Sequence, residues 1–307
     1  MSTPRVTLDQ WRTLQAVVDY GGYAQAAQQL HRSQSSVSYA ISRLQEQLGV
    51  ALLRVEGRKA QLTEAGEALL LRSRPLVQAA VELEQLAHSL GQGWEPEVRL
   101  VVDAAFPTGL LMQALRRFEP LCPNTTVQLS EVVLTGADEA LEEGRADLAV
   151  GERVPSRFLG DPLIGIEFVA VAAPDHPLHG LGREVALGDL ERERQVIVRD
   201  SGMRRQRDTG WLGAEQRWTV SSIDSAVAAV CAGLGFAWLP RHAIAAQLRD
   251  GALAPVALGK GQVYRAQLFL VYGQHNPGPA VRQLAGLLED LAGAERLEKA
   301  KPRRGGN

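Results

Sequence analysis

Residues 22–48 constrain the fold of this chain more than any other stretch. Two short helical patterns lie within it, separated by a break at His31, Arg32 and Ser33. Two helices joined by so short a turn are typical of a helix-turn-helix, whose second helix enters the major groove of DNA. The sequence therefore predicts a DNA-binding element near the N-terminus.

The second helical pattern combines an apolar stripe with a polar face. Apolar residues recur at spacings of four, three and four, which predicts one buried side of a helix; they are Val37, Ile41, Leu44 and Leu48. The other faces carry hydrogen-bonding side chains suited to base edges and phosphates, although a helical bundle with a polar solvent face is the alternative. The DNA contacts predicted here are Arg32, Ser33, Gln34, Ser35, Ser38, Tyr39 and Arg43.

A short β-hairpin is predicted after this helix. Two apolar-flanked pieces, residues 52–55 and 60–62, are joined by a polar turn. Arg54, Arg58 and Lys59 would extend a basic surface towards the phosphate backbone or the minor groove, unless the hairpin is only a solvated turn. Charge agrees with this placement: residues 1–62 carry a net +3, although the chain of 307 residues carries −2.

A long helix with a leucine repeat is predicted from Glu64 to about Leu90, with Thr63 as its cap. Leucines recur every seven residues, at positions 69, 76, 83 and 90, as in a coiled-coil seam, although Pro75 is expected to kink the helix. A helix of about 40 Å is too long for a small domain to cover. The sequence therefore predicts that the helix pairs with a second copy of the chain as a homodimer.

Three segments carry a resemblance to a known family: AAQQL at 26–30, SQSSVSYAISRLQEQLG at 33–49 and LTEAGE at 62–67. In this order and spacing they resemble the DNA-binding domain and linker helix of LysR-type transcriptional regulators. The chain departs from the family where Leu14 and Leu53 replace a frequent Phe, Tyr23 a frequent Ser, and Gln45 a frequent Glu. The resemblance implies a winged helix-turn-helix that binds double-stranded DNA, and an oligomer that is often a homotetramer.

Strand and helix patterns alternate after a hinge at residues 91–93, which predicts an α/β domain with a parallel, doubly wound sheet. Two strands, about 166–173 and 264–272, are expected to connect two lobes. This order is similar to the effector-binding domain of the LysR-type family, itself built like a periplasmic small-molecule binding protein. The predicted divisions are 1–62 for the DNA-binding domain, 63–90 for the linker helix, 91–295 for the effector domain and 296–307 for a flexible basic tail; lobe I is about 94–161 with 274–295, and lobe II about 162–273.

An effector site is predicted between the lobes, because ligands of open α/β sheets bind outside the carboxyl ends of strands. Capping and turn formation are the alternative roles for several of these residues. The basic stretch 199–207 indicates an anionic effector, an oligomer contact or an exposed loop. The aromatic residues Phe106, Trp218 and Trp238 could form an aromatic pocket or pack in the core. The predicted effector contacts are Ala105, Phe106, Pro107, Thr108, Thr135, Gly136, Arg199, Asp200, Ser201, Gly202, Ser221 and Ser222.

Other function classes have little support in the sequence. It contains no Gly-rich phosphate loop and no nucleophile elbow, and its only closely spaced histidines, His176 and His179, flank a proline in a turn-like segment. We therefore expect no enzyme activity, metal site or cofactor. A redox sensor that uses Cys122 and Cys231 is a third possibility. The sequence argues against it, because both thiols are expected to be buried and inert. With no membrane span and no signal peptide expected, the predicted location is the cytoplasm.

These observations together predict a ligand-responsive transcription regulator. Its N-terminal domain would hold a DNA site, and closure of the lobes around a small molecule would change how dimers or tetramers sit on the promoter.

Overall fold

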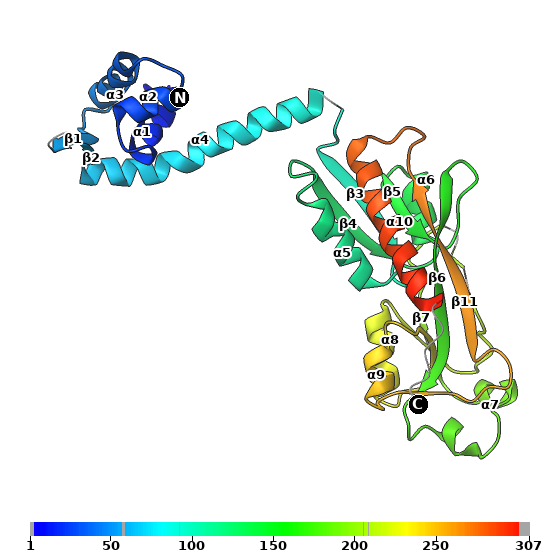
Figure 1. The fold of residues 1–307 in the computed structure, drawn as a ribbon. Coiled ribbons are helices and arrows are strands. Elements are labelled where there is room, and N and C mark those ends of the chain that lie inside the picture. The colour runs from blue at the N-terminus through cyan, green and yellow to red at the C-terminus, as the bar shows by residue number, and fades with distance from the viewer. Residues whose placement is uncertain (1–2, 57–58, 92, 205, 208, 301–307) are drawn as a thin grey trace. The chain divides into compact units, whose positions relative to one another are not determined.

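The protein folds into two compact units, which a computed structural model describes for residues 3–56, 59–91, 93–204, 206–207 and 209–300. One unit comprises Met1–Gln92 and the other Gly93–Asn307 (Figure 1). No helix in these ranges is long and apolar enough to span a membrane.

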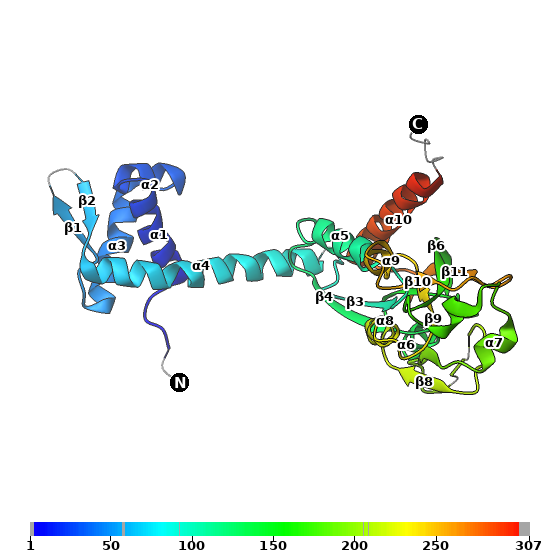
Figure 2. The same cartoon turned by 90° about the horizontal axis from the view of Figure 1, so that it is seen from below.

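The N-terminal unit is a three-helix bundle with a hairpin and a long helix. Figure 2 shows the β1–β2 hairpin projecting beside α3. The predicted helix-turn-helix and hairpin are confirmed, and the helical pattern continues through Pro75. The elements are α1 (Leu8–Asp19), α2 (Tyr23–Gln29), α3 (Gln34–Leu48), β1 (Leu53–Glu56), β2 (Lys59–Leu62) and α4 (Glu64–Gly91).

Local capping fixes where the first and third helices begin. The Thr7 hydroxyl accepts a hydrogen bond from the Gln10 backbone N–H at 3.2 Å, and the Gln10 side chain accepts one from the Thr7 N–H at 2.8 Å. Ser33 caps α3 by accepting from the Ser36 N–H at 3.2 Å. The turn before α3 places His31 in the left-handed region, at φ 53°. These contacts satisfy backbone donors that a helix N-terminus leaves unpaired.

The wing is tied to α3 by one side chain. Gln45 Oε1 accepts hydrogen bonds from the backbone N–H groups of Leu52 at 2.7 Å and Leu53 at 3.0 Å. Leu52 is fully buried in the core that α3 shares with α1 and α4. Gln45 therefore fixes the start of the hairpin relative to α3.

Only the first part of α4 is covered by this core. Leu70 is buried, and Leu69 packs against the same cluster. Further along, Leu76 is 57% exposed and Leu83 67% exposed. The side chains of residues 86 and 90 lie outside the described residues. Two leucines of the predicted seam therefore remain uncovered within the unit.

The C-terminal unit is built on one mixed sheet, with strand order β10-β6-β11-β5-β3-β4 and β9 paired to β6. A separate pair, β7 and β8, belongs to the second lobe. The elements are β3 (Glu97–Asp103), α5 (Thr108–Phe118), β4 (Thr126–Val132), α6 (Gly136–Glu142), β5 (Leu148–Gly151), β6 (Leu159–Ala172), η1 (Pro177–Leu181), α7 (Leu187–Glu191), β7 (Gln195–Val198), β8 (Arg217–Val220), α8 (Ile223–Cys231), β9 (Ala237–Pro240), α9 (Ala245–Arg249), β10 (Ala254–Pro255), β11 (Val263–Tyr272) and α10 (Pro279–Ala300).

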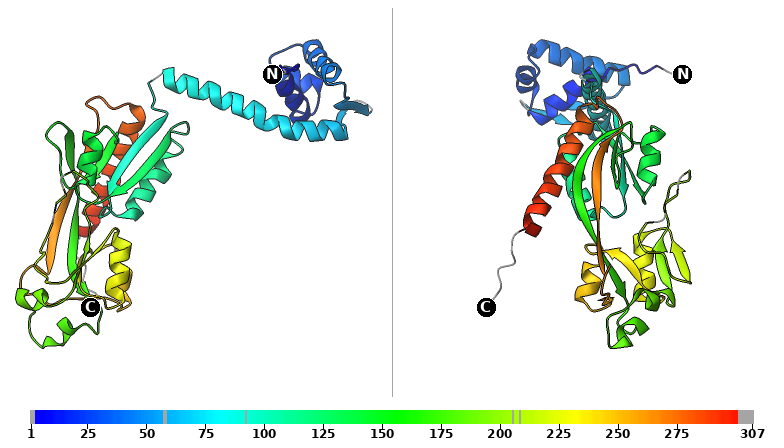
Figure 3. Two further views of the ribbon diagram at one scale, coloured as in Figure 1. Left: turned by 180° about the vertical axis from the view of Figure 1, so that it is seen from behind. Right: turned by 90° about the vertical axis from the view of Figure 1, so that its right-hand side faces the viewer.

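Strands β6 and β11 connect the two lobes, as Figure 3 shows where they run side by side. The expectation of a wholly parallel sheet is wrong: β3 is parallel to β4 and β5, but β11 is antiparallel to both β5 and β6. The reason is that β11 returns the chain from the second lobe to α10 in the first. Strand β6 also begins at Leu159, seven residues before the predicted start at 166. The prediction began too late because Gly160 and Pro162 are residue types typical of turns.

The last helix is longer than the sequence indicated. The pattern predicted a helix over 280–291 and a flexible tail from 296, but α10 continues to Ala300. Leu284 and Leu288 are fully buried against the first lobe, and the Arg296 side chain donates to the Ala292 carbonyl at 3.4 Å. A tail beginning at 296 is therefore wrong, and residues 301–307 lie outside the described part of the chain.

We predict that Gln45→Ala destabilises the N-terminal unit by about 1–3 kcal/mol, because it leaves two partly buried backbone N–H groups without an acceptor. Glu46→Ala is the matched control, since that side chain is 68% exposed and pairs only with Arg43 at the surface. Scanning calorimetry of the full chain should show the first variant melting several degrees lower, at about 4–8 °C per kcal/mol. Equal melting of both variants would contradict this role for Gln45.

Candidate DNA interface and effector cavity

Helix α3 presents a continuous polar face. Gln34, Ser35 and Ser38 are exposed, and Tyr39 is 71% exposed. The opposite stripe is buried, since Val37, Ile41 and Leu44 have exposed fractions of 0–1%. Packing of the stripe therefore fixes which side of α3 faces outward, and the outward side carries four of the predicted DNA contacts.

Three further predicted contacts already have partners within the unit. Both terminal guanidinium nitrogens of Arg32 donate to the Asp9 carboxylate at 2.8 Å, and these hydrogen bonds lower the pKa of Asp9. Arg43 pairs with Glu46 at 2.6 Å, and Ser33 Oγ lies 3.0 Å from Ser35 Oγ besides capping α3. The Arg32 pair holds the turn against α1 and leaves the guanidinium at the surface.

The predicted wing contacts are described only in part. Arg54 is exposed on β1, opposite Gln61 on β2. Arg58 and the side chain of Lys59 lie outside the described residues. The structure therefore leaves the predicted contacts at the wing tip as predictions.

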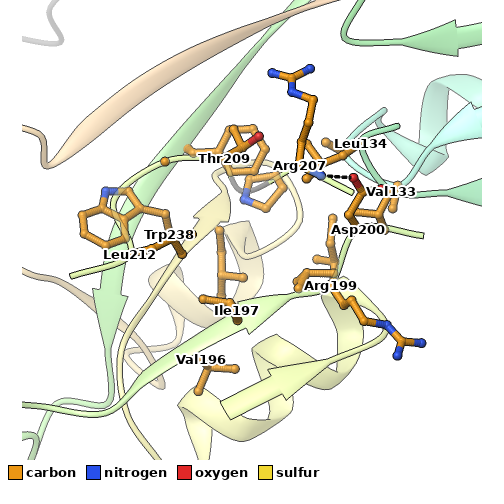
Figure 4. Close-up of a pocket in the computed structure, with 18 of the residues that line it drawn as sticks. Val133, Leu134, Val196, Ile197, Arg199, Asp200, Arg207, Thr209, Leu212 and Trp238 are labelled. Atoms are coloured by element: carbon orange, nitrogen blue, oxygen red, sulfur yellow. Dashed lines mark hydrogen bonds between the residues drawn. The ribbon is translucent and has the colours of Figure 1, made fainter. Parts of the chain in front are cut away.

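A cavity of about 260 Å³ lies between the two lobes of the C-terminal unit (Figure 4). The first lobe contributes the end of β3, Glu152 directly after β5 and the segment after β4. The second lobe contributes β7 and residues 206–207 and 209–212, and the crossing strands contribute Phe168 and Tyr264. Of the twelve predicted effector contacts, Ala105, Arg199 and Asp200 line it. Arg199 is exposed, and Figure 4 shows its guanidinium pointing away from Trp238.

Four other predicted contacts, Thr135, Gly136, Ser201 and Gly202, join Asp200 where the two lobes meet, either through hydrogen bonds between the lobes or by packing beside them. The buried carboxylate of Asp200 accepts hydrogen bonds from Thr135 Oγ1 at 2.8 and 2.9 Å and from the Thr135 N–H at 3.1 Å. Ser201 Oγ accepts from the Val133 N–H at 2.9 Å. We call this contact the interlobe clasp; it comprises Val133, Thr135, Gly136, Asp200, Ser201 and Gly202.

Glycine is required at two positions of the interlobe clasp. A Cβ atom on Gly136 would lie 2.2 Å from Ser201 Oγ, and one on Gly202 would lie 2.0 Å from Thr135 Oγ1. Neither glycine has a positive φ, so the need is for space. The interlobe clasp thus depends on close approach of two backbone segments.

Glu139 adds hydrogen bonds between the lobes beside the interlobe clasp, and the sequence analysis did not predict it. It is 7% exposed on α6, and its carboxylate accepts hydrogen bonds from the backbone N–H groups of Met203 at 2.8 Å and Arg204 at 2.7 Å. Its partners lie more than sixty positions away in the chain. Nothing in the local pattern of α6 distinguishes it from a solvated glutamate.

The remaining predicted effector residues lie outside the cavity wall. Phe106 packs in the core of the first lobe, Pro107 precedes α5, and Thr108 is exposed. Ser221 is exposed, while Ser222 caps α8 by accepting from the Ser225 N–H at 3.1 Å. For Ser222 the structure shows the capping role that the sequence offered as the alternative.

Two carboxyl groups that the sequence analysis did not single out face the cavity from the first lobe. Asp103 accepts backbone hydrogen bonds from Ala105 at 2.8 Å and Leu134 at 2.9 Å, and burial raises its pKa to about 7. Burial also raises the pKa of Glu152, Arg207 opposing the shift. Asp103 ends β3 and Glu152 directly follows β5, so both lie at the carboxyl ends of strands, where the rule that selected Ala105 applies.

The tryptophans divide between cavity and surface. Trp238 lines the cavity, and its Nε1 donates to the Gly261 carbonyl at 2.9 Å; Trp211 lies beside it with ring centroids 5.9 Å apart. Trp218 instead is 46% exposed, with the Arg194 guanidinium 4.4 Å above its ring.

The two cysteines and His176 lie in packed or capping positions. Cys122 is buried in the first lobe's core, and burial raises the pKa of its thiol, which disfavours the reactive thiolate. Cys231 is half-buried at the end of α8. His176 Nδ1 accepts from the Leu178 N–H at 3.3 Å, capping the short helix η1.

Comparison with known proteins assigns both units. Residues 8–67 match the family described as "Bacterial regulatory helix-turn-helix protein, lysR family", and residues 91–293 match the "LysR substrate binding domain". The chain is 33% identical over 267 residues to the "Probable HTH-type transcriptional regulator YhaJ" of Escherichia coli (strain K12), covering 82% of this chain and 86% of that protein. It is 28% identical over 290 residues to the "HTH-type transcriptional regulator PunR" of the same strain, covering 92% of each.

Solved structures share the fold. Full-length LysG from Corynebacterium glutamicum has a TM-score of 0.51 at 20% identity, covering 94% of this chain and 99% of that chain. ArgP from Mycobacterium tuberculosis has a TM-score of 0.52 at 19% identity, covering 92% and 96%. Because family matches cover both units and a relative above 30% identity spans most of the chain, the protein belongs to the LysR family of DNA-binding transcriptional regulators.

Proposed function

We propose that this regulator binds a small-molecule effector in the cavity between its lobes, and that binding changes how its subunits are arranged on a promoter. The observation that carries the proposal is a cavity of about 260 Å³ whose wall comes from both lobes and from the two strands that join them. A ligand there would contact both lobes at once, so its affinity would depend on their separation. LysG from Corynebacterium glutamicum has been solved with a bound effector, Arg, which supports an effector role for this fold.

The proposed DNA contacts are the outward face of α3 and the wing. Gln34, Ser38 and Tyr39 are exposed on a helix whose opposite side is packed, which suits direct contact with base edges. Arg54 on the wing suits the phosphate backbone, which contributes affinity without sequence preference.

The proposed self-association uses α4. Leu76 and Leu83 are exposed, one heptad apart, and a helix pair would bury them. Two subunits would then present two recognition helices to two half-sites, and a homotetramer would follow from pairing of two such dimers.

We predict that Gln34→Ala and Ser38→Ala relax base preference, each by about 1–3 kcal/mol at one operator position. Arg54→Ala should instead weaken binding to all sequences and reduce the slope of log affinity against log salt by about one. Footprinting and salt titrations on a promoter fragment measure both effects. Arg241→Ala, an exposed arginine of the C-terminal unit, is the control. Identical footprints and slopes for all four variants would argue against this docking.

We predict that Leu76→Glu combined with Leu83→Glu lowers the mass of the assembly in analytical ultracentrifugation, because charges would be forced into an apolar helix pair. Leu71→Glu is the matched control: Leu71 is 71% exposed, but it lies two residues beyond Leu69 and so on another face of α4. An unchanged mass for the double variant would exclude this seam as the contact.

We predict that Gly136→Ala opens the interlobe clasp, since the added Cβ would lie 2.2 Å from Ser201 Oγ. Hydrogen exchange of the full chain should show faster exchange at the amides that Asp200 and Glu139 bind, including Gly202 and Met203. Gly109→Ala is the control, because nothing lies within 4 Å of its added Cβ. Unchanged protection in the Gly136 variant would show that the lobes are held by other contacts.

A further inference from the structure

We propose that the cavity takes a small organic cation, a protonated amine on an aromatic or apolar body, and that Glu152 binds its ammonium group. This inference rests on the proposed effector function of the same cavity and adds the chemistry of the ligand. It is carried by the hydrogen-bond acceptors of the cavity wall, the position of its arginines and its aromatic rings.

The carboxylates in the wall differ in what already binds them. Asp200 accepts a hydrogen bond from the Thr135 hydroxyl. It also accepts hydrogen bonds from the backbone N–H groups of Gly202 and Arg207, both at 2.8 Å. Asp103 accepts two backbone hydrogen bonds. Glu152 receives no hydrogen bond and no ion pair from any residue within the described ranges, although it is half-buried and lines the cavity. Within the described part of the chain, the carboxyl group of Glu152 is therefore available to a donor on a ligand.

The described arginines of the basic stretch form no ion pair with Glu152, although the charge of Arg207 acts on it and opposes the rise of its pKa. Figure 4 shows the guanidinium groups of Arg199 and Arg207 pointing away from each other, and Arg199 is exposed. Arg204 pairs with Glu143 at 3.1 Å, outside the cavity. Arg207 lines the cavity, but it forms no ion pair with Glu152. Among the described arginines of the stretch that indicated an anionic effector in the sequence, Arg199 and Arg207 line the cavity, and only Arg207 is half-buried, whereas Asp103, Glu152 and Asp200 all line the same cavity.

Aromatic rings lie close to the same carboxyl groups. Phe168 and Tyr264 are stacked with ring centroids 4.6 Å apart, and both line the cavity. Burial raises the pKa of the Tyr264 hydroxyl, and the charges of Glu152 and Asp103 raise it further, which places both carboxyl groups near this ring. A carboxylate beside aromatic faces is an environment that binds an ammonium group by charge pairing and by cation–π contact.

The second lobe contributes another acceptor. Gln195 is 3% exposed, and its Nε2 donates to the Trp211 carbonyl at 2.8 Å, which fixes the amide orientation. Its Oε1 is buried in the wall with no hydrogen-bond partner among the described residues. Glu152 and Gln195 Oε1 are acceptors, and the Thr209 hydroxyl, which also lines the cavity with no partner among the described residues, can either donate or accept. A ligand that completes the two acceptors carries donors.

The test compares three probes with the same ring and different charge: 2-phenylethylamine, 2-phenylethanol and phenylacetate. We expect calorimetric titration of the full chain to give an affinity for the amine at least about tenfold higher than for the other two. Glu152→Gln should reduce amine affinity by about tenfold or more and leave the alcohol within about threefold, because the amide keeps the shape and removes the charge. Glu119→Gln, an exposed carboxylate on the same unit, should change neither.

Two results would overturn the inference in different ways. Tighter binding of phenylacetate, or an unchanged amine affinity in Glu152→Gln, would reject the ligand chemistry and leave the effector function of the cavity standing. Failure of all three probes to bind would count against the cavity as an effector site as well.

Discussion

The buried carboxylate of Asp200 is the interaction on which the C-terminal unit depends. A carboxylate out of water costs several kcal/mol unless donors surround it. Here the donors come from the first lobe, at Thr135, and from its own loop, at Gly202 and Arg207. Separating the lobes removes the donors that Thr135 supplies to this carboxylate and leaves it with the donors of its own loop. The cavity exists between surfaces that this contact holds in register, and the close backbone approach explains why glycine occupies position 136.

The same principle explains why the other carboxyl groups of the wall behave differently. The two carboxyl oxygens of Asp103 accept hydrogen bonds from the backbone N–H groups of Ala105 and Leu134, and Leu134 has a left-handed φ of 53°. Such a conformation is uncommon for a residue with a side chain, so the surrounding contacts must favour it. Glu152 accepts no such hydrogen bond from the described residues. Asp103 therefore orders the backbone of the cavity wall, and Glu152 is the carboxyl group that we propose for the ligand.

The sequence could predict the N-terminal unit because its determinants are local. The Thr7 and Gln10 capping pair spans three residues, and the stripe from Val37 to Leu44 follows the period of a single helix. The interlobe clasp was beyond such reasoning, since Thr135 and Asp200 are 65 positions apart and their pairing depends on the direction of β6 and β11. The positions predicted for the effector were close to the lobe boundary for the correct reason, the carboxyl ends of strands. What sequence could not decide was which of these residues face the cavity and which face the other lobe.

A ligand shifts an equilibrium between lobe arrangements only by the difference in its affinity for them. Glu152 lies on the first lobe and Gln195 on the second, so a ligand that contacts both would favour the arrangement in which the lobes are close. The interlobe clasp favours that arrangement without any ligand. Moving a two-state equilibrium from 1:99 to 99:1 requires about 5.5 kcal/mol of differential affinity. For the proposed effector, the strength of the interlobe clasp, and not ligand affinity alone, would therefore set how far binding changes the arrangement of the lobes.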